Sequence, residues 1–337
     1  MLKFKIKAFS MPLKRPFRIS RYTVETQQTA IVSISDGDCT GYGEATANPY
    51  YSSSIEKIEE SVVSVRSMVE KVNGTHPNDL WHQIEPGLRT DYFSLSAIDC
   101  AYWDYFARAN NRTLRSYWSN SETDSILSNY TIGIDSIEIM KEKILEKPWP
   151  IYKIKLGTPD DISIIRELRT VTDALFRVDA NCAWTVDETI RNAKELKALY
   201  VEFIEQPLPA DDWEGMRYLK SRSVLPTIAD ESCQRYEDVR RCAEAFHGIN
   251  IKLMKCGGIT PALQMIKTAR ELGLKVMAGC MTESTVGISN LTQLAPLLDY
   301  IDADGPLLLK EDIATGVSFQ KGRIIYSSNP GSGAVLK

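Results

Sequence analysis

Short apolar runs and longer amphipathic stretches alternate along most of this chain. The apolar runs have the length of strands that are buried on both faces, and the amphipathic stretches repeat their apolar positions at helical spacing. From residue 130 onward this pattern predicts eight strands, at residues 130–134, 151–156, 176–179, 203–205, 227–230, 249–253, 275–278 and 300–302.

Helices are expected between these strands. Strands that alternate with helices predict a parallel sheet, and eight such strands predict a closed barrel. We therefore expect an α/β fold of the modified TIM-barrel type, (β/α)7β. The helical stretches cover residues 136–146, 160–172, 186–198, 213–222, 237–245, 260–272 and 287–298.

The first part of the chain follows a different pattern. Alternation of apolar and polar side chains predicts antiparallel strands, and helical spacing returns between residues 54 and 117. Two polar segments, at residues 15–28 and 45–53, predict loops. The expected strands cover residues 2–9, 29–35 and 40–44, and a hairpin turn at Asp36-Gly37-Asp38 joins the last two.

These patterns predict two domains. Residues 1–120 are expected to form an α+β capping domain, and residues 121–305 are expected to form the barrel. The segment at residues 306–337 contains Gly and Pro and lacks helical spacing, so we expect it to return to the capping domain.

The composition narrows the classes of function. Of 337 residues, 43% are hydrophobic and 25% are charged, which is typical of a soluble globular protein. A net charge of −4 argues against a nucleic-acid-binding surface. No apolar run is long enough to cross a membrane, the N-terminus lacks a signal-peptide core, and seven cysteines without a CxxC pair suit reduced thiols. We expect a cytoplasmic protein without nucleic-acid or membrane partners.

Charged side chains stand at the ends of several predicted strands. Lys155, Asp179, Glu205, Asp230 and Lys255 follow one another at intervals of 24 to 26 residues, one strand–helix unit each. This period places them together at the C-terminal rim of the barrel, where this fold holds its catalytic groups. Charged residues on unrelated loops would not be expected to recur at the spacing of the strands.

Three of these side chains suit a metal ion. Asp179, Glu205 and Asp230 come from adjacent strands and are expected at one level. Three carboxylates favour a hard octahedral cation that leaves room for water and substrate oxygen, Mg²⁺ before Ca²⁺. Zinc is disfavoured because no His or Cys joins the set. We expect one Mg²⁺ per subunit.

Lys155 and Lys255 are expected to face each other across the barrel mouth, because their strands are four apart out of eight. Crowded cations and a metal would lower the pKa of one lysine, so that it could act as a base. A base that removes a proton α to a carboxylate, with the metal and Lys153 stabilising the enediolate, predicts racemisation or epimerisation. An elimination that uses only part of this set of groups is the alternative reaction.

Plainer interpretations exist for some of these residues. Lys153 and Lys155 would be ordinary on an exposed edge strand, but the other rim groups in phase with them argue against this. Asp302 and Asp304 could instead form a solvated loop, and that alternative stays open. Cys280 is expected to pack against the pocket rather than to act as a nucleophile, because no activating base is evident.

The combined motifs resemble the enolase superfamily, in its muconate-lactonising subgroup, over nearly the whole chain. The resemblance implies that Lys155 and Lys255 are the acid/base pair, and that Asp179, Glu205 and Asp230 bind Mg²⁺ beside an enediolate. The matching motifs are Lys153-Ile154-Lys155, Asp179-Ala180-Asn181, Glu205-Gln206-Pro207, Asp230-Glu231-Ser232 and Ile251-Lys252-Leu253-Met254-Lys255.

Asp302-Ala303-Asp304 further resembles the DxD pair of the dipeptide epimerases. The resemblance implies inversion of the C-terminal residue in an Ala-containing dipeptide, of the kind released in peptidoglycan turnover. Substrate contacts are then expected from Thr131, Lys153, Cys280, Thr282, Asp302 and Asp304, with Asn181 and Glu283 in support.

The loops at residues 15–28 and 45–53 would cap the site and select side chains, through Arg18, Arg21, Tyr22 and Tyr50. Tyr22 stands where Ala–Glu epimerases carry an arginine. A preference for Glu and a preference for a small or apolar second residue therefore both stay open.

Other functions fit the same scaffold. N-acylamino acid racemase, o-succinylbenzoate synthase and muconate cycloisomerase act on substrates without a free ammonium group. A barrel that binds a metal or peptide without catalysis belongs to another class, and the full acid/base set argues against it. The partner expected is a small dipeptide, and self-association into a homo-oligomer is left open.

Overall fold

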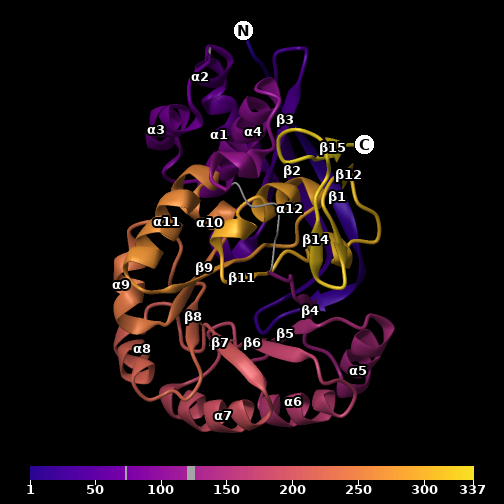
Figure 1. The fold of residues 1–337 in the computed structure, drawn as a ribbon, viewed down its shortest axis with the longest axis vertical. Coiled ribbons are helices and arrows are strands. Elements are labelled where there is room, and N and C mark those ends of the chain that lie inside the picture. The colour runs from indigo at the N-terminus through magenta and orange to yellow at the C-terminus, as the bar shows by residue number, and fades with distance from the viewer. Residues whose placement is uncertain (73, 120–125) are drawn as a thin grey trace.

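The computed structural model describes residues 1–72, 74–119 and 126–337. They form two adjoining parts, an N-terminal part with a small sheet and helices and a larger part with a ring of strands (Figure 1). The domain boundary predicted at residues 120 and 121 lies outside the described residues, so it stays a prediction.

A three-stranded antiparallel sheet begins the chain, in the order β1–β2–β3. It consists of β1 (Lys3–Arg18), β2 (Thr23–Ser35) and β3 (Thr40–Thr46). The loop predicted at residues 15–28 is wrong, because β1 and β2 continue through most of it as a long hairpin. We call residues 10–28 the arm.

The arm was missed because it is polar on one side only. An antiparallel pair can bury one face and leave the other in water. Met11, Leu13, Phe17 and Val24 pack in a small apolar cluster with Leu309, while Pro12, Lys14 and Pro16 are exposed. A short turn closes the arm at its tip.

Helices cover the N-terminal sheet. The long helix α4 (Tyr92–Ala109) lies directly against β3, and two glycines permit this approach: a Cβ at Gly41 or Gly43 would overlap the helix backbone at Tyr105 or Ala97. The other elements of this part are η1 (Pro49–Tyr51), α1 (Ile55–Ser64), α2 (Arg66–Glu70), α3 (Pro77–Leu88) and η2 (Leu114–Tyr117).

Eight parallel strands form the second part, in sequence order from β4 to β11. A bridge between Ser128 and Ile301 joins the two ends of this sheet, so the strands form a ring. The predicted modified TIM barrel is confirmed. Its strands are β4 (Tyr130–Ile132), β5 (Ile151–Lys155), β6 (Leu175–Asp179), β7 (Val201–Glu205), β8 (Thr227–Ala229), β9 (Gly248–Ile251), β10 (Lys275–Ala278) and β11 (Tyr300–Ile301).

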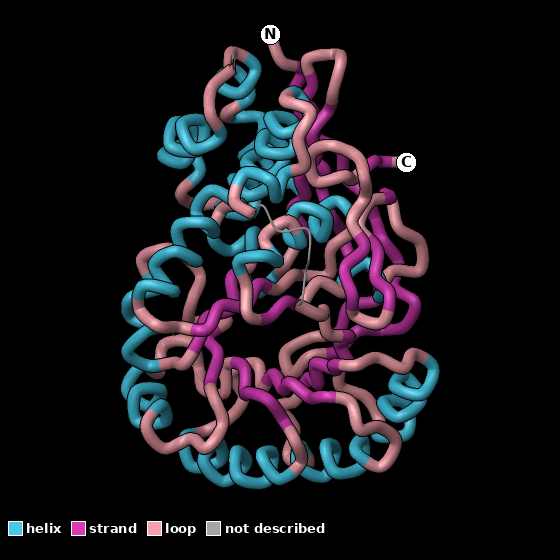
Figure 2. Tube along the Cα trace, in the orientation of Figure 1, coloured by secondary structure: helices cyan, strands magenta, loops and turns pink. Residues whose placement is uncertain are grey.

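The larger helices lie outside the strands (Figure 2). Two one-turn helices, α10 (Leu253–Cys256) and α13 (Gly305–Leu308), fall outside the prediction, and α12 (Thr285–Thr292) is followed by η3 (Ala295–Leu297). None of the described helices is both long enough and apolar enough to span a bilayer. The remaining helices are α5 (Ile137–Glu146), α6 (Asp161–Arg169), α7 (Val186–Ala198), α8 (Trp213–Lys220), α9 (Asp238–Ala245) and α11 (Ile259–Glu271).

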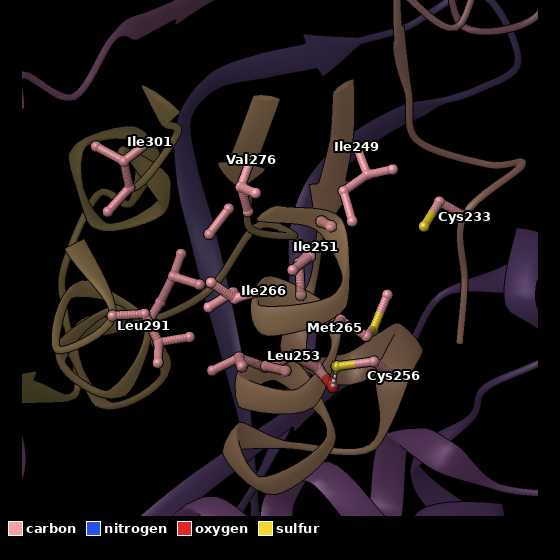
Figure 3. Close-up of a cluster of buried hydrophobic side chains, with 14 of the residues drawn as sticks. Cys233, Ile249, Ile251, Leu253, Cys256, Met265, Ile266, Val276, Leu291 and Ile301 are labelled. Carbon is pink, nitrogen blue, oxygen red and sulfur yellow. Dashed lines mark hydrogen bonds between the residues drawn. The ribbon is translucent and has the colours of Figure 1, made fainter. Parts of the chain in front are cut away.

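Side chains alternate across the barrel strands. On β9 and β10, Ile249, Ile251 and Val276 join an apolar cluster with Ile266 of α11 (Figure 3). The residues between them face the other way, as strand geometry requires. On β5 the same alternation turns Lys153 and Lys155 into the barrel mouth.

The C-terminal segment packs against the N-terminal part (Figure 1). Arg108 of α4 donates to Ala334 O at 2.5 Å, and Leu114 N donates to Gly331 O at 2.8 Å. Ala314 also packs in an apolar cluster with Ile31 of β2. The short strands of this segment are β12 (Ala314–Thr315), β13 (Ser318–Gln320), β14 (Arg323–Ile325) and β15 (Val335–Leu336).

Candidate active site

A pocket lies between the C-terminal rim of the barrel and the tip of the arm. The barrel lines it mostly with charged and polar side chains, and the residues that the arm contributes include Ile19, Arg21 and Tyr22. The tip is held on the rim by a hydrogen bond from Ile134 N to Arg18 O, 2.9 Å long. The arm therefore forms one wall of the site.

Three carboxylates meet where adjacent barrel strands end. Asp179 ends β6, Glu205 ends β7 and Asp230 directly follows β8, and all three side chains are buried. Asp179 pairs with Glu205 in the parallel ladder, which puts the two at the same level. One ligand atom of each residue lies within 4.8 Å of the others.

The three acids titrate differently. Burial and the charge of Asp179 raise the pKa of Glu205 to about 7. Burial also opposes ionisation of Asp179 and Asp230, but Lys155 beside the first and Lys252 beside the second outweigh it. The pKa of Asp179 is therefore lowered, and that of Asp230 lies well below its ordinary value.

This donor set fits Mg²⁺. All three residues offer oxygen, which hard cations prefer, and neither His nor Cys joins the cluster among the described residues. Glu205 Oε2 is buried and accepts no hydrogen bond from any residue that the structure describes, although Lys153 Nζ lies 2.8 Å away as an ion-pair partner. A cation held among the carboxylates would satisfy this oxygen.

Two lysines of β5 contact the carboxylates and line the pocket. Lys153 Nζ lies 2.9 Å from Glu205 Oε1 and 3.0 Å from Asp302 Oδ2. Lys155 Nζ lies 2.6 Å from Asp179 Oδ2. The acidic cluster is thus neutralised in part from this wall.

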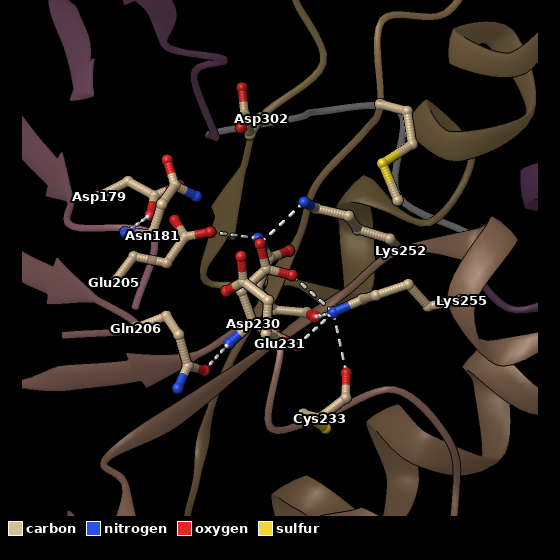
Figure 4. Close-up of polar contacts among 12 residues, drawn as sticks. Asp179, Asn181, Glu205, Gln206, Asp230, Glu231, Cys233, Lys252, Lys255 and Asp302 are labelled. Atoms are coloured by element: carbon tan, nitrogen blue, oxygen red, sulfur yellow. Dashed lines mark hydrogen bonds and ion pairs between the residues drawn. The ribbon is translucent and has the colours of Figure 1, made fainter. Parts of the chain in front are cut away.

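A third lysine reaches the cluster from the facing wall (Figure 4). Lys252, which follows β9, lines the pocket, and its Nζ lies 2.8 Å from Asp230 Oδ2. Because β5 and β9 are four strands apart in a ring of eight, Lys155 and Lys252 approach the carboxylates from opposite sides.

The pKa values of Lys153 and Lys252 are both raised. Burial lowers the pKa of Lys153, but Asp302, Glu205 and Asp179 outweigh it, and the pKa lies well above its ordinary value. Burial likewise lowers the pKa of Lys252, and the charge of Asp230 reverses this and raises it. Neighbouring carboxylates therefore dominate over neighbouring cations.

Lys255 does not lie where the sequence predicts. Its side chain is fully buried on α10, and it is not among the residues that line the pocket. Its Nζ lies 2.6 Å from Asp230 Oδ1 and contacts three carbonyl oxygens. The prediction that Lys255 faces Lys155 across the mouth is wrong, and Lys252 occupies that place.

The reason is the point at which β9 ends. The strand stops at Ile251, two residues earlier than expected, and α10 begins at Leu253. Strand alternation carries Asn250, and then Lys252, to the inner face, where Asn250 Nδ2 donates to Glu205 Oε1 at 2.8 Å. Alternation was the signal that could have identified Lys252, whereas the regular spacing favoured Lys255.

A second acidic group lies in the same pocket. Asp302 and Asp304 are both buried, so they do not form a solvated loop. Thr131 N donates to Asp304 Oδ2 at 2.5 Å, and Asn129 Nδ2 donates to Asp302 Oδ1 at 2.7 Å. Both carboxylates are thereby fixed beside β4.

Asp302 and Asp304 are both buried, but their pKa values are shifted in opposite directions. Burial opposes ionisation of Asp302, but Lys153 outweighs it and lowers the pKa to about 2. Burial together with the charge of Asp302 raises the pKa of Asp304 to about 8. Near neutral pH the pair therefore carries about one negative charge.

The other predicted contact and support residues lie close by. Thr131, Cys280, Thr282 and Asn181 line the pocket. Burial raises the pKa of the Cys280 thiol well above its ordinary value, which fits packing rather than nucleophilic attack. Asn181 adopts a left-handed φ of 46°, and its N donates to Asp179 Oδ1 at 2.9 Å.

Glu283 lies away from the pocket lining and accepts a hydrogen bond from Met281 N at 2.8 Å. Burial and the charge of Glu44 raise its pKa to about 8. Its position beside a second buried carboxylate suits support of the rim rather than substrate contact.

The four predicted specificity residues divide into two kinds. Arg21, Tyr22 and Tyr50 line the pocket, whereas Arg18 contacts the rim through its carbonyl. Arg21 Nη2 lies 2.5 Å from Glu231 Oε1, and its guanidinium lies 4.2 Å from the centre of the Tyr50 ring. Glu231 directly follows Asp230 and belongs to one of the matching motifs, but the sequence pattern predicted no role for it in the site.

A (β/α)7β barrel with carboxylates on three successive strand ends and lysines on facing walls defines an enolase-type barrel. Residues 137–337 match the family described as Enolase C-terminal domain-like, and residues 2–116 match the Mandelate racemase / muconate lactonizing enzyme N-terminal domain. The chain belongs to this family.

Its relatives have named activities. The L-Ala-D/L-amino acid epimerase of Flavobacterium johnsoniae is 49% identical over 99% of this chain and 100% of its own length. A substrate-liganded L-Ala-D/L-Glu epimerase from Bacillus subtilis matches with a TM-score of 0.94 and 27% identity, over 99% of this chain and 98% of its own. A dipeptide epimerase from Enterococcus faecalis V583, complexed with Mg and L-Leu-L-Tyr, matches with a TM-score of 0.93 and 28% identity over 98% of each chain.

Glu283→Gln should stabilise the protein at high pH. The protonated Glu283 contributes stability that is full below the ordinary pKa of 4.5 and is lost as the pH rises through about 8. A pKa change of one corresponds to about 1.4 kcal/mol, so we expect the free energy of unfolding at pH 8.5 to rise by at least about 1 kcal/mol. Guanidinium unfolding between pH 5 and 9 measures this.

The variant and the wild type should differ less toward pH 5, where Glu283 is protonated. Glu214→Gln, on the exposed side of α8, should leave the pH dependence unchanged. An unaltered slope in Glu283→Gln would contradict the burial argument.

Proposed function

We propose that this protein is a Mg²⁺-dependent dipeptide epimerase that inverts the α-carbon of the C-terminal residue. One observation carries the proposal: lysines on facing walls of a single pocket contact the three carboxylates that fit Mg²⁺, and the buried pair Asp302 and Asp304 lines the same pocket. The named activities of the relatives support it, as does the Mg-dipeptide complex of the Enterococcus faecalis enzyme.

The charges of the pocket orient a dipeptide. Its carboxylate suits the side with the metal and Lys153, which is held as an ammonium by the surrounding acids. Its α-ammonium suits Asp302 and Asp304, which carry about one negative charge together. This orientation puts the α-carbon of the C-terminal residue between the walls that carry Lys155 and Lys252.

The residues then divide the chemistry. Asp179, Glu205 and Asp230 would hold Mg²⁺, which when bound supplies positive charge beside the substrate carboxylate. Lys153 adds a charge-assisted hydrogen bond to that carboxylate as negative charge develops on it.

Lys155 and Lys252 move the proton. One of them, as the free amine, accepts the α-proton on one face, and the other, as the ammonium, donates a proton on the opposite face. The charge of Asp230 raises the pKa of Lys252, and a cation held by Asp230 would weaken that effect. Removal on one side and return on the other inverts the carbon.

We also propose a small or apolar second residue in preference to Glu. Arg21 is the cation of the arm that lines the pocket, and it is already paired with the buried Glu231 and with Asn181 O. The walls around it are apolar or aromatic, including Ile19, Tyr22 and Tyr50. An acidic side chain would find no unpaired arginine on this wall.

Lys155→Met and Lys252→Met should each abolish epimerisation, because each removes one of two proton-transfer groups. We expect losses of roughly 10² to 10⁴-fold in turnover of L-Ala-L-Val. Proton NMR in D₂O follows deuterium uptake at the α-carbon, and chiral chromatography follows inversion.

Lys194→Met, on the exposed side of α7, is the matched control and should behave as the wild type. Full epimerisation by either pocket variant would refute the two-lysine mechanism. No exchange by the wild type with any dipeptide of a library would favour a binding protein without catalysis.

Asp302→Asn combined with Asp304→Asn should separate dipeptides from substrates without an ammonium. Removing the partner of a buried charge costs about 2–5 kcal/mol, so kcat/KM for L-Ala-L-Val should fall by roughly 30-fold or more. Asp304→Asn alone should be milder, because Asp304 is largely protonated near neutral pH.

Turnover of N-acetyl-L-valine and o-succinylbenzoate precursors is the comparison. An N-acylamino acid racemase, o-succinylbenzoate synthase or muconate cycloisomerase would keep its own activity in the double variant. A dipeptide activity that survives both substitutions would exclude the assigned ammonium site.

The second-residue preference is tested by substrate pairs. The wild type should prefer L-Ala-L-Val to L-Ala-L-Glu by at least about tenfold in kcat/KM, the ratio for 1.4 kcal/mol. Glu231→Gln releases the charge of Arg21 and should narrow that ratio, whereas Arg21→Met in the same assay should not. A wild type that prefers L-Ala-L-Glu would contradict the assignment.

A further inference from the structure

Lys255 is a buried cation surrounded by protein oxygens. Its side chain has no exposed surface. Its Nζ lies 2.6 Å from Asp230 Oδ1, and it also contacts the carbonyl oxygens of Asp230 at 2.5 Å, Cys233 at 2.9 Å and Asn250 at 3.2 Å. An ammonium group has three N–H donors, so these neighbours use its whole capacity. Lys255 therefore has no donor left for a substrate.

Two lysines each contact a different oxygen of the Asp230 carboxylate (Figure 4). Lys255 binds Oδ1 away from the pocket lining, whereas Lys252 lies 2.8 Å from Oδ2 and lines the pocket. One oxygen of Asp230 is thus occupied by an internal cation, and the other stays on the side of the acidic cluster.

Lys255 also binds backbone carbonyl oxygens of two neighbouring segments. Those of Asp230 and Cys233 belong to the loop after β8, and that of Asn250 belongs to β9. The single turn of α10 brings Lys255 back to these oxygens, and Gly257 ends the turn with a left-handed φ of 95°. Removing the ammonium would take a donor from four buried acceptors at once.

We propose that Lys255 is a positioning residue of the metal site, which fixes Asp230 so that Oδ2 is presented to the cation. This inference rests on the proposed function, because it assumes that Asp230 binds Mg²⁺. Groups that orient a metal ligand typically change metal affinity about 10- to 100-fold.

Lys255→Met and Lys252→Met form a matched pair that tests this role. Each removes one positive charge beside the same carboxylate, so charge alone predicts tighter Mg²⁺ binding in both. Positioning predicts opposite results: about tenfold weaker binding in Lys255→Met, and tighter binding in Lys252→Met, which loses only a competitor at Oδ2. Calorimetric titration of the metal-free variants with Mg²⁺ measures both.

Turnover gives a second readout. At saturating Mg²⁺, Lys255→Met should regain epimerisation toward the wild-type rate, whereas Lys252→Met should not. Lys255→Gln keeps two N–H donors without the charge and should recover part of the lost affinity.

Tighter or unchanged Mg²⁺ binding in Lys255→Met would overturn the positioning role and leave the proposed function intact. Loss of the fold in both Lys255→Met and Lys255→Gln, seen by circular dichroism, would overturn it in favour of a structural role. Failure of the wild type to bind Mg²⁺ would instead refute the proposed function.

Discussion

Three carboxylates buried within a few ångströms of one another dominate the energetics of the barrel mouth. Asp179, Glu205 and Asp230 repel one another in a place where water does not screen them. Buried charges of this kind are tolerated only when opposite charges and hydrogen bonds compensate for the loss of water. This requirement is met by the side chains that contact the carboxylates, which are Lys153, Lys155, Lys252, Lys255 and Asn250.

Lysines at different depths in the barrel neutralise the negative charge of the carboxylates. Lys153, Lys155 and Lys252 reach them from the pocket and are therefore available to a bound molecule, whereas Lys255 reaches Asp230 from the interior and is not. The same chemical group thus serves two purposes, and burial decides between them. A base must meet solvent or substrate, but a counter-ion need only meet its acid.

The two structural parts divide the work of recognition. The barrel carries the charged groups, because the ends of parallel strands bring residues from distant points of the sequence to one rim. The arm and the segment around Tyr50 add a wall that is mainly apolar and aromatic, with Arg21 neutralised by Glu231. The charged groups and the apolar wall thus come from different elements of the chain.

The amino-acid pattern was enough to predict the barrel and its acidic cluster, because strand length, helical spacing and a period of one strand–helix unit are local properties that repeat along the chain. It also indicated that Lys153 and Lys155 share a face, since alternation follows from the backbone of a single strand. The loop predicted at residues 15–28 was wrong, because the apolar face of the arm packs against Leu309 and Ile313, which lie far away in the sequence. The choice between Lys252 and Lys255 was missed, because strand alternation favours Lys252 whereas the spacing of one strand–helix unit favours Lys255, and the point at which β9 ends separates the two. The end of β9 and the turn of α10 place one ammonium in the pocket and the other behind Asp230, and three residues of sequence separation do not reveal that difference.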